Sequence, residues 1–239
     1  MEIFYNENLI TKDDLLSFGP EESRHINKVL RKKVGEIINV TNGRGLEWKG
    51  ELISTDNHRA TAKKTEVNLH HNKIAPLHIA IAPTKNNDRL EWFLEKATEI
   101  GISEITPLIC DHSERKTIKS ERMKKILVSA LKQSIQYFLP QLNPIISFEA
   151  FMKLDHPRKK LIAHCKKGNK TTIHQIRDLK NKILILIGPE GDFSDREIQT
   201  ALNHSFEAIK LSSHRLRTET AAIVACSKIA TLNEILNIK

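Results

Sequence analysis

Residues 183–198, ILILIGPEGDFSDREI, decide the fold class of this chain. Five consecutive apolar residues, 183–187, predict a strand that is buried on both faces, as the strands of parallel sheets are. The GPEG turn at 188–191 then ends the strand. Ser194, followed three residues later by Glu197, forms the capping-box pattern that begins a helix. Such a unit places backbone groups at the carboxyl edge of a parallel sheet, where open α/β folds bind ligands.

The same turn argues against two common nucleotide sites. It lacks the Gly-Lys-Ser/Thr ending of a P-loop, and it lacks the G-x-G-x-x-G pattern of dinucleotide-binding folds. We therefore do not expect a nucleoside triphosphate or a dinucleotide as the ligand.

The remaining pattern divides the chain into two parts. Residues 1–70 read as short strands with a hairpin signal at Asn42-Gly43, which predicts a small β-barrel, and residues 68–76 read as a linker. Beyond the linker, strands alternate with amphipathic helices such as 88–100, and this order predicts a parallel sheet with helices on both faces. The expected strands of this second part are 77–82, 105–109, 160–163, 183–187 and 208–211.

Composition narrows the class of protein. The chain is 39% hydrophobic, its three cysteines are isolated from one another, and its apolar runs are too short to span a membrane. We expect a soluble, cytoplasmic protein without a signal peptide, a disulfide framework or a metal site. The net charge of +9 favours a polyanionic partner, although a merely soluble basic protein has such a charge too.

A second stretch identifies a family. Residues 211–222, LSSHRLRTETAA, lead into an apolar helix. GPEGDFS and LRTETA, in this order and spacing, resemble the signature of the RsmE family, the 16S rRNA uracil-N3 methyltransferases of the SPOUT superfamily. The resemblance covers the whole chain and includes RHINKVLRKKVGE near the start and DRLEWFLEKATEIGISEITPL in the middle. Two residues depart from it, because the family usually has glycine where this chain has Asp192 and Ser212.

The resemblance implies an α/β fold in which residues 74–239 form a SPOUT methyltransferase domain. Its parallel sheet is tied into a trefoil knot, and a PUA-like β-barrel that binds RNA, residues 1–70, precedes it. It also implies a homodimer through the knot face and S-adenosylmethionine as the cofactor. The residues expected around the cofactor are Ala163, His164, Leu186, Ile187, Gly188, Pro189, Glu190, Gly191, Leu211, Ser212, Arg215, Leu216 and Thr218.

Basic residues gather in two further places. Residues 22–33 have a helical pattern in which cations surround an apolar face of Ile26, Val29 and Leu30. A second basic cluster precedes a longer helix, whose apolar spacing runs from Met123 to Phe138 and which Pro140 is expected to end. Cations suit RNA phosphates, although charge runs are often only solvated faces. With the implied fold, we expect these residues to bind RNA: Arg24, His25, Lys28, Arg31, Lys32, Lys85, Arg89, Arg115 and Lys116.

Arg217 and Glu219 are the candidate catalytic residues. A methyl group on a sulfonium is already activated, so catalysis reduces to in-line positioning and removal of the uracil N3 proton. Arg217 would stabilise the developing uracil anion, and Glu219 would orient Arg217 or act as the base. The structural alternative is an ion pair between them that holds Thr218 as a helix N-cap.

The sequence thus predicts an S-adenosylmethionine-dependent methyltransferase that modifies N3 of one uridine in small-subunit 16S rRNA. Two alternatives stay open. One is another SPOUT enzyme that methylates ribose 2′-oxygens or a tRNA base. The other is a non-catalytic RNA-binding factor in ribosome assembly.

Overall fold

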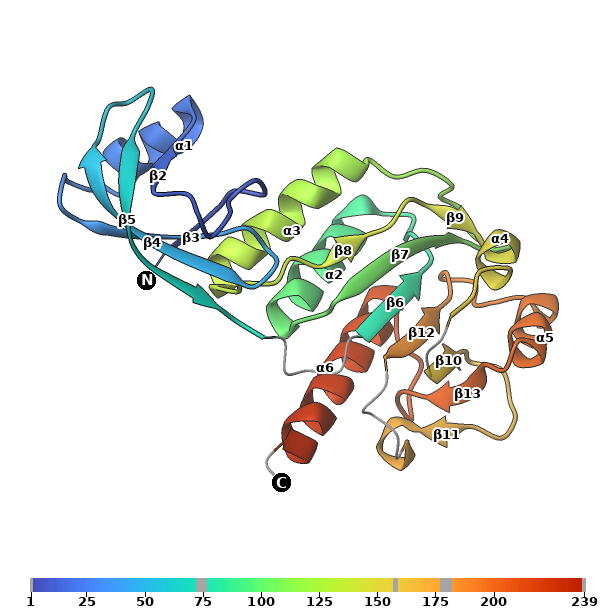
Figure 1. Ribbon diagram of the computed structural model, residues 1–239. Helices are drawn as coiled ribbons and strands as arrows, with labels where there is room; N and C mark the ends of the chain where they lie inside the picture. The colour runs from blue at the N-terminus through green and yellow to red at the C-terminus, as the bar shows by residue number, and fades with distance from the viewer. Residues whose placement is uncertain (1, 72–76, 157–158, 177–181, 238–239) are drawn as a thin grey trace. The chain divides into compact units, whose positions relative to one another are not determined.

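The computed structural model describes residues 2–71, 77–156, 159–176 and 182–237 (Figure 1). The chain forms two compact units, one of residues 1–72 and 131–139 and the other of residues 73–130 and 140–239. Each unit has its own sheet and its own buried core. Of the helices in the described ranges, none is long and apolar enough to cross a membrane.

The first unit is built on a curled five-stranded sheet. The strands lie in the order β1-β3-β4-β5-β2, and only β1 and β3 run parallel. The hairpin between β3 and β4 turns at Gly43 and Gly45, whose φ angles of 72° and 90° lie in the left-handed region that glycine adopts readily. The strands are β1 (Ile3–Tyr5), β2 (Leu15–Ser17), β3 (Ile37–Thr41), β4 (Leu46–Ser54) and β5 (Thr61–Leu69).

The basic segment 22–33 is less regular than its sequence pattern predicts. Helix α1 (Pro20–Arg24) passes into one wide turn, η1 (His25–Val29), instead of continuing as an α-helix. Ile26 is fully buried in the core of this unit, but Val29 is 65% exposed. The expected apolar face is therefore wrong at Val29, because the wider turn rotates that residue out of the helical register.

Residues 131–139 belong to the first unit although they are far from it in sequence. Helix α3 (Ser120–Ser134) ends where Ile135 takes a φ of 54°, earlier than the apolar spacing predicts. The Tyr137 ring then stacks on His70 at 4.0 Å, and its hydroxyl donates to Glu47 Oε1 at 2.9 Å. Burial and this carboxylate raise the pKa of Tyr137 to about 12, so the hydroxyl stays protonated and keeps its hydrogen bond.

The second unit is built on a parallel sheet in the order β11-β13-β10-β12-β6-β7-β8, with β9 paired to β7. All five residues of β12 are buried, because this strand lies between β10 and β6 and both of its faces are covered. The strands are β6 (Leu77–Ile81), β7 (Glu104–Ile109), β8 (Gln141–Leu142), β9 (Ile146–Ser147), β10 (Lys159–Ala163), β11 (Thr171–Thr172), β12 (Ile183–Ile187) and β13 (Glu207–Lys210).

Helices cover both faces of this sheet, which confirms the predicted fold class. On one face α6 (Thr218–Asn237) packs along α2 (Asn87–Ile100), and on the other lie α4 (Phe148–Met152) and α5 (Asp195–Asn203) (Figure 1). Helix α2 begins at the N-cap Asn86 and ends at Gly101, whose φ is 97°.

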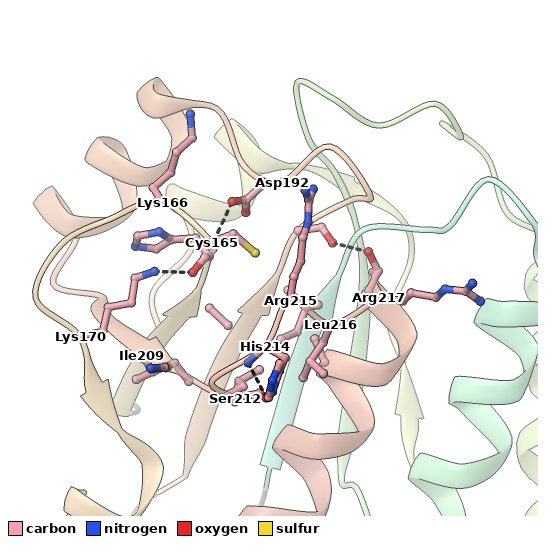
Figure 2. Close-up of a pocket in the computed structure, with 18 of the residues that line it drawn as sticks. Cys165, Lys166, Lys170, Asp192, Ile209, Ser212, His214, Arg215, Leu216 and Arg217 are labelled. Atoms are coloured by element: carbon pink, nitrogen blue, oxygen red, sulfur yellow. Dashed lines mark hydrogen bonds between the residues drawn. The ribbon is translucent and has the colours of Figure 1, made fainter.

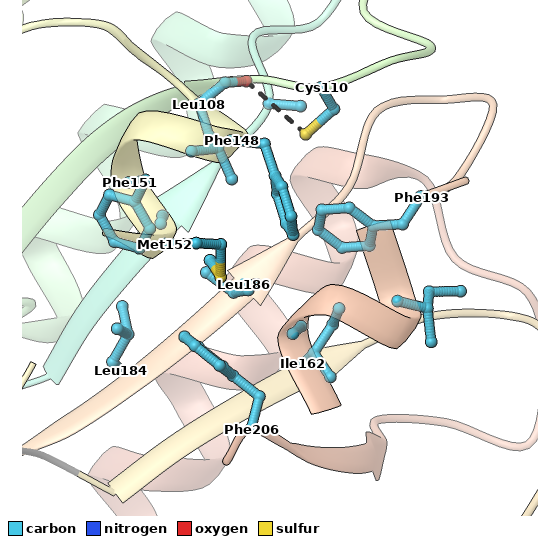
Figure 3. Packing of buried hydrophobic residues seen from close by; sticks show 14 residues of the cluster. Leu108, Cys110, Phe148, Phe151, Met152, Ile162, Leu184, Leu186, Phe193 and Phe206 are labelled. Atoms are coloured by element: carbon cyan, nitrogen blue, oxygen red, sulfur yellow. Dashed lines mark hydrogen bonds between the residues drawn. The ribbon is translucent and has the colours of Figure 1, made fainter. Parts of the chain in front are cut away.

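The core under α4 and α5 is rich in phenylalanine (Figure 3). The Phe148 ring of α4 lies 6.0 Å from the ring of Phe193, which directly precedes the N-cap of α5, and Phe151 belongs to the same cluster. These rings pack over Leu184 and Leu186 of β12. Phe193 thereby anchors the turn that follows β12 to the core of the sheet.

Candidate functional site

A cavity of about 840 Å³ lies at the carboxyl ends of β10, β12 and β13 (Figure 2). These strands are parallel neighbours, so their ends open at one edge of the sheet. The walls come from three segments, residues 163–170, 187–192 and 209–218, together with Ala221. The GPEG turn and the LRTETA segment, which are far apart in the sequence, therefore meet in one pocket.

The described lining residues include Arg217 and the residues expected around the cofactor, except Leu186 and Gly191. Leu186 is fully buried in the core under α4 and α5. Gly191 lies beside His112, whose Cβ is 3.1 Å from the place that a Cβ on this glycine would take.

Hydrogen bonds tie the GPEG turn to two other segments. The Thr218 hydroxyl donates to the carbonyl of Gly188 at 3.1 Å, and Arg215 donates to the carbonyl of Glu190 at 3.3 Å. The backbone N–H of Lys85 donates to the Glu190 carboxylate at 3.1 Å. A Cβ on Gly188 would lie 3.0 Å from the Phe193 ring, so a side chain there would disturb the packing of the turn.

Asp192 adds a tie between two walls of the pocket. Its φ of 65° is left-handed, which aspartate tolerates because its short side chain bonds to nearby backbone. One carboxylate oxygen accepts from the N–H of Cys165 at 2.8 Å, and the other accepts from the N–H of Phe193 at 2.9 Å. The departure from glycine therefore keeps the turn and links it to the segment after β10.

His164 contributes an unpaired polar atom to the lining. Its Nδ1 is buried and has no hydrogen-bond partner among the described residues. Burial lowers the pKa of this imidazole, and Lys170 and Lys166 lower it further, while Asp192 opposes them. The ring is therefore neutral at pH 7, and its free nitrogen suits a polar ligand.

Several lining residues were not predicted. Most of the sequence CKKGNK, residues 165–170, lines one wall just after β10, and Asp192, Ile209, Lys210, Ser213 and His214 also line the cavity. A polar, glycine-containing run after a buried strand is the signal that would have found this wall, because ligands sit at that edge. In the described part of the chain, no three His, Cys, Asp or Glu side chains are grouped to hold a metal ion.

The two candidate catalytic residues lie differently. Arg217 lines the cavity, and Figure 2 shows its side chain turned away from Arg215 and towards α2. Glu219 is only 7% exposed, and its Oε1 lies 3.9 Å from Nε of Arg89. Its Oε2 is buried without a hydrogen-bond partner among the residues the structure describes.

The structural alternative for this pair finds no support. Among the ion pairs of the described residues, none joins Arg217 to Glu219, whose carboxylate faces Arg89 instead. Thr218 is itself the first residue of α6, and its hydroxyl bonds to Gly188.

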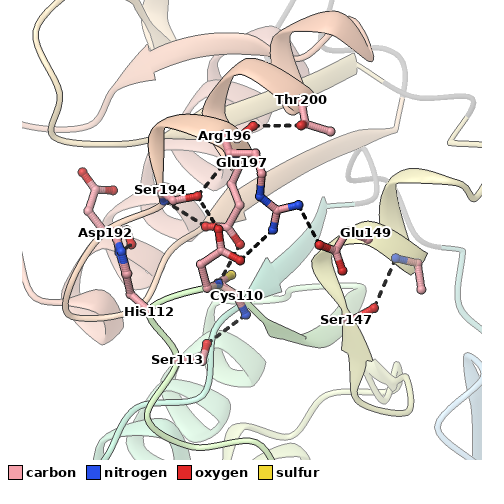
Figure 4. Close-up of polar contacts among 12 residues, drawn as sticks. Cys110, His112, Ser113, Ser147, Glu149, Asp192, Ser194, Arg196, Glu197 and Thr200 are labelled. Atoms are coloured by element: carbon pink, nitrogen blue, oxygen red, sulfur yellow. Dashed lines mark hydrogen bonds and ion pairs between the residues drawn. The ribbon is translucent and has the colours of Figure 1, made fainter.

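A polar network fixes the beginning of α5 (Figure 4). The capping box is confirmed: Ser194 and Glu197 each accept from the other's backbone N–H. Glu197 is fully buried, and its second oxygen accepts from the N–H of Asp111 at 2.9 Å. Arg196 bridges Asp111 and Glu149 at 2.7 Å each. The Ser194 hydroxyl and then Arg196 lower the pKa of Asp111, so the network holds its charge at neutral pH.

Replacing Glu197 with glutamine is expected to destabilise the protein by about 1–3 kcal/mol, because one backbone N–H of Asp111 or Ser194 loses its acceptor. Urea unfolding measures the change. Gln199→Ala, on the exposed face of the same helix, is the control and should stay within about 0.5 kcal/mol of the wild type. Equal stability of the two variants would contradict this role of Glu197.

The residues expected to bind RNA fall into two groups. In the first unit Arg24, Lys28 and Arg31 are exposed, whereas Lys32 pairs with Glu36 at 3.2 Å. His25 is half-buried, and its ring lies 6.2 Å from Phe4.

In the second unit most of the expected cations have partners in the protein. Arg115 is half-buried and donates to the carbonyls of Thr84 and Lys85, so it holds a turn. The Lys85 ammonium pairs with Glu114 at 2.9 Å, and Arg89 lies near Glu219. Lys116 is exposed.

Two family models match the chain. One, described as an RNA methyltransferase domain, matches residues 70–230, and the other, an RNA methyltransferase PUA domain, matches residues 18–65. The fold, the pocket and these matches define the chain as an RNA methyltransferase with a PUA domain.

The chain belongs more particularly to the ribosomal RNA small subunit methyltransferase E family, as its motifs predicted. It is 31% identical to that enzyme of Buchnera aphidicola, over 90% of this chain and 87% of the relative. A crystal structure of a probable rRNA-methyltransferase from Porphyromonas gingivalis is 35% identical, with a TM-score of 0.90 over 99% of this chain and 100% of that one. The Neisseria gonorrhoeae ribosomal RNA small subunit methyltransferase E, solved with S-adenosyl methionine bound, is 29% identical. Its TM-score is 0.87, over 97% of this chain and 98% of that one.

Proposed function

We propose that this protein transfers a methyl group from S-adenosylmethionine to N3 of one uridine in 16S rRNA. The observation that carries the proposal is the pocket that the GPEG turn and the LRTETA segment form together. It lies in a chain whose relative from Neisseria gonorrhoeae was solved with this cofactor.

The residues present fit the cofactor. The cavity of about 840 Å³ falls in the range of small-molecule sites. Ile187, Leu211 and Leu216 offer apolar walls for a purine ring, and the unpaired Nδ1 of His164 offers a polar partner. Glycine at position 188 fits the tight packing of the turn against Phe193.

The bound cofactor supplies an electrophilic methyl group, and the protein's residues do the rest. They hold the uracil in line with that methyl group and remove the N3 proton. Arg217, in the pocket lining, stabilises the uracil anion as it forms. Glu219, which is buried with one free oxygen, orients the cations around it or accepts the proton.

The wider arrangement follows the family. Residues 1–70 form the PUA-like domain that captures rRNA, and residues 74–239 form the methyltransferase domain. Within the second range, 74–76, 157–158, 177–181 and 238–239 lie outside the described residues. The C-terminal segment threads the trefoil knot, whose loops are the three pocket segments, and two copies pair through the knot face. The substrate is the rRNA of the small ribosomal subunit in the cytoplasm.

Mapping N3-methyluridine in rRNA from cells with and without the protein tests the proposal. The modification should be present at one position in 16S rRNA and absent when the gene is deleted. A lost ribose 2′-O-methyl group or tRNA modification would instead support another SPOUT activity, and an unchanged RNA would support a non-catalytic role.

Cofactor affinity is expected to fall as the pH drops below the lowered pKa of His164. Burial lowers the pKa of His164 from 6.5, so its neutral form persists down to that lowered pKa and the imidazolium appears only below it. The imidazolium would repel the cationic cofactor and occupy the nitrogen that accepts a hydrogen bond. Calorimetric titration at several pH values measures the fall, and His164→Asn should flatten it. A wild-type profile that is already flat would contradict this role of His164.

A further inference from the structure

Acidic side chains are scarce in the pocket. Among its described lining residues Glu190 and Asp192 are the carboxylates. Five lysines and arginines line it besides Arg217, whose side chain turns away towards α2: Lys166, Lys167, Lys170, Lys210 and Arg215. The proposed cofactor carries a fixed positive charge on sulfur, and the thioether left after methyl transfer does not. A lining with excess positive charge disfavours the cationic donor relative to that product.

The two carboxylates differ in their attachment. Glu190 reaches out of the turn, where one oxygen accepts from the N–H of Lys85 at 3.1 Å. Asp192 is held by both oxygens, one on the N–H of Cys165 and one on the N–H of Phe193. Its own N–H donates to Pro189, and its carbonyl lies 2.9 Å from His112 Nδ1.

These bonds hold the Asp192 charge in place between two walls of the cavity. A carboxylate has about four acceptor positions, so two backbone bonds leave its charge and further acceptor capacity available. The positive φ of 65° would suit glycine better, and here the side-chain bonds offset the strain.

We infer that Asp192 is a specificity-determining residue, whose carboxylate lets this cation-rich pocket hold the positively charged methyl donor in preference to its uncharged thioether product. The inference rests on the proposed function and deepens it. Asp192 stands where the family usually has glycine, and glycine has no charge with which it could perform this role.

The charge of Asp192 already acts on one neighbour in the pocket. It opposes burial, Lys170 and Lys166 in setting the pKa of His164. The charge of Asp192 therefore acts on a residue that lines the pocket, and not only on solvent. Two of the lining lysines have partners of their own: Lys170 donates to the His164 carbonyl at 2.6 Å, and Lys166 pairs with Asp195 at 3.0 Å.

Asp192→Asn removes the charge and keeps a residue that tolerates the left-handed conformation. Asp155→Asn is the matched control, since it removes the same charge from an exposed side chain that does not line the cavity. Calorimetry would give the affinity of each protein for S-adenosylmethionine and for S-adenosylhomocysteine, at about 50 mM and about 500 mM salt. Thermal unfolding of the ligand-free proteins would report stability separately.

Asp192→Asn should weaken the methyl donor about 5- to 20-fold more than the thioether, and high salt should shrink this difference. Asp155→Asn should change the ratio of the two affinities less than about twofold. Asp192→Gly, which also loses the backbone ties, should show the same shift in ratio together with a loss for both ligands.

These measurements distinguish a failure of the role of Asp192 from a failure of the proposed methyltransferase function. Equal weakening of both ligands by Asp192→Asn, or an unchanged pair of affinities, would overturn the role of its charge while leaving the methyltransferase assignment in place. A wild-type protein that binds neither ligand would overturn the proposed function itself.

Discussion

Replacing Arg217 with alanine is expected to lower the single-turnover rate of methyl transfer by about two to three orders of magnitude, the effect of losing one oriented stabilising group. The uracil N3 must lose its proton as the new bond forms, and the guanidinium stabilises the negative charge that results. Arg217 turns towards α2 and away from Arg215 (Figure 2), so cofactor affinity should change less than about threefold.

The control for Arg217 is an arginine of the same unit outside the pocket. Arg122→Ala removes a cation that is paired with Glu91 on the protein surface, and its single-turnover rate should match the wild type. A wild-type single-turnover rate in Arg217→Ala would contradict the catalytic role of Arg217 and leave it only a structural one.

Glu219→Gln separates the two roles left for that carboxylate. If Glu219 is the base, the variant should lose the rise of the single-turnover rate with pH. If it orients the neighbouring cations, the rate should fall by a similar factor at every pH. A variant with the wild-type rate and pH profile would exclude both roles.

Neutralising three exposed cations of the first unit is expected to weaken rRNA binding about 10- to 100-fold near physiological salt. The variant is Arg24→Gln, Lys28→Gln and Arg31→Gln, and each lost phosphate contact should reduce the slope of log affinity against log salt by about 0.7–0.9. Cofactor affinity should not change, because none of the three lines the pocket.

The matched control neutralises three exposed lysines outside the predicted set, Lys12, Lys153 and Lys182. Filter binding at several salt concentrations compares the two variants. Equal losses would mean that only net charge matters, and no loss in either would contradict RNA capture by this surface.

Point substitutions test RNA binding better than removal of residues 1–72, because a truncated chain would keep residues 131–139 without the rest of the unit to which they belong. Residues 131–139 belong to the first unit, where Tyr137 stacks on His70 and bonds to Glu47. A truncated chain that begins near residue 73 would keep Tyr137 without these partners. Its loss of RNA affinity would then mix misfolding with lost contacts.

Local patterns predicted the elements that build the site. The unbroken apolar run 183–187 predicted a central parallel strand, and Ser194 with Glu197 predicted the helix start after it. Both patterns are local, because each is formed by residues that lie within a few positions of one another in the sequence. The resemblance to the family predicted that a second segment, 211–218, lies at the same edge of the sheet, and this segment lines the pocket.

Features that depend on distant contacts had no such signal. No local sequence pattern shows that Arg115 donates to the carbonyls of Thr84 and Lys85, so its positive charge alone predicts that it binds RNA. The left-handed φ of Asp192 is stabilised by Cys165, which lies 27 residues earlier. Residues 131–139 continue a helical apolar pattern, yet tertiary contacts place them in the first unit.

Incubation of the purified protein with labelled S-adenosylmethionine and small subunits from cells that lack it tests the central claim most directly. Nucleoside mass spectrometry of the digested rRNA would identify the labelled product. The account predicts N3-methyluridine at one position in 16S rRNA, and a yield that Arg217→Ala reduces sharply at the same time point. Label in a ribose 2′-O-methyl group or in another base, or no label from a protein that binds the cofactor, would contradict it.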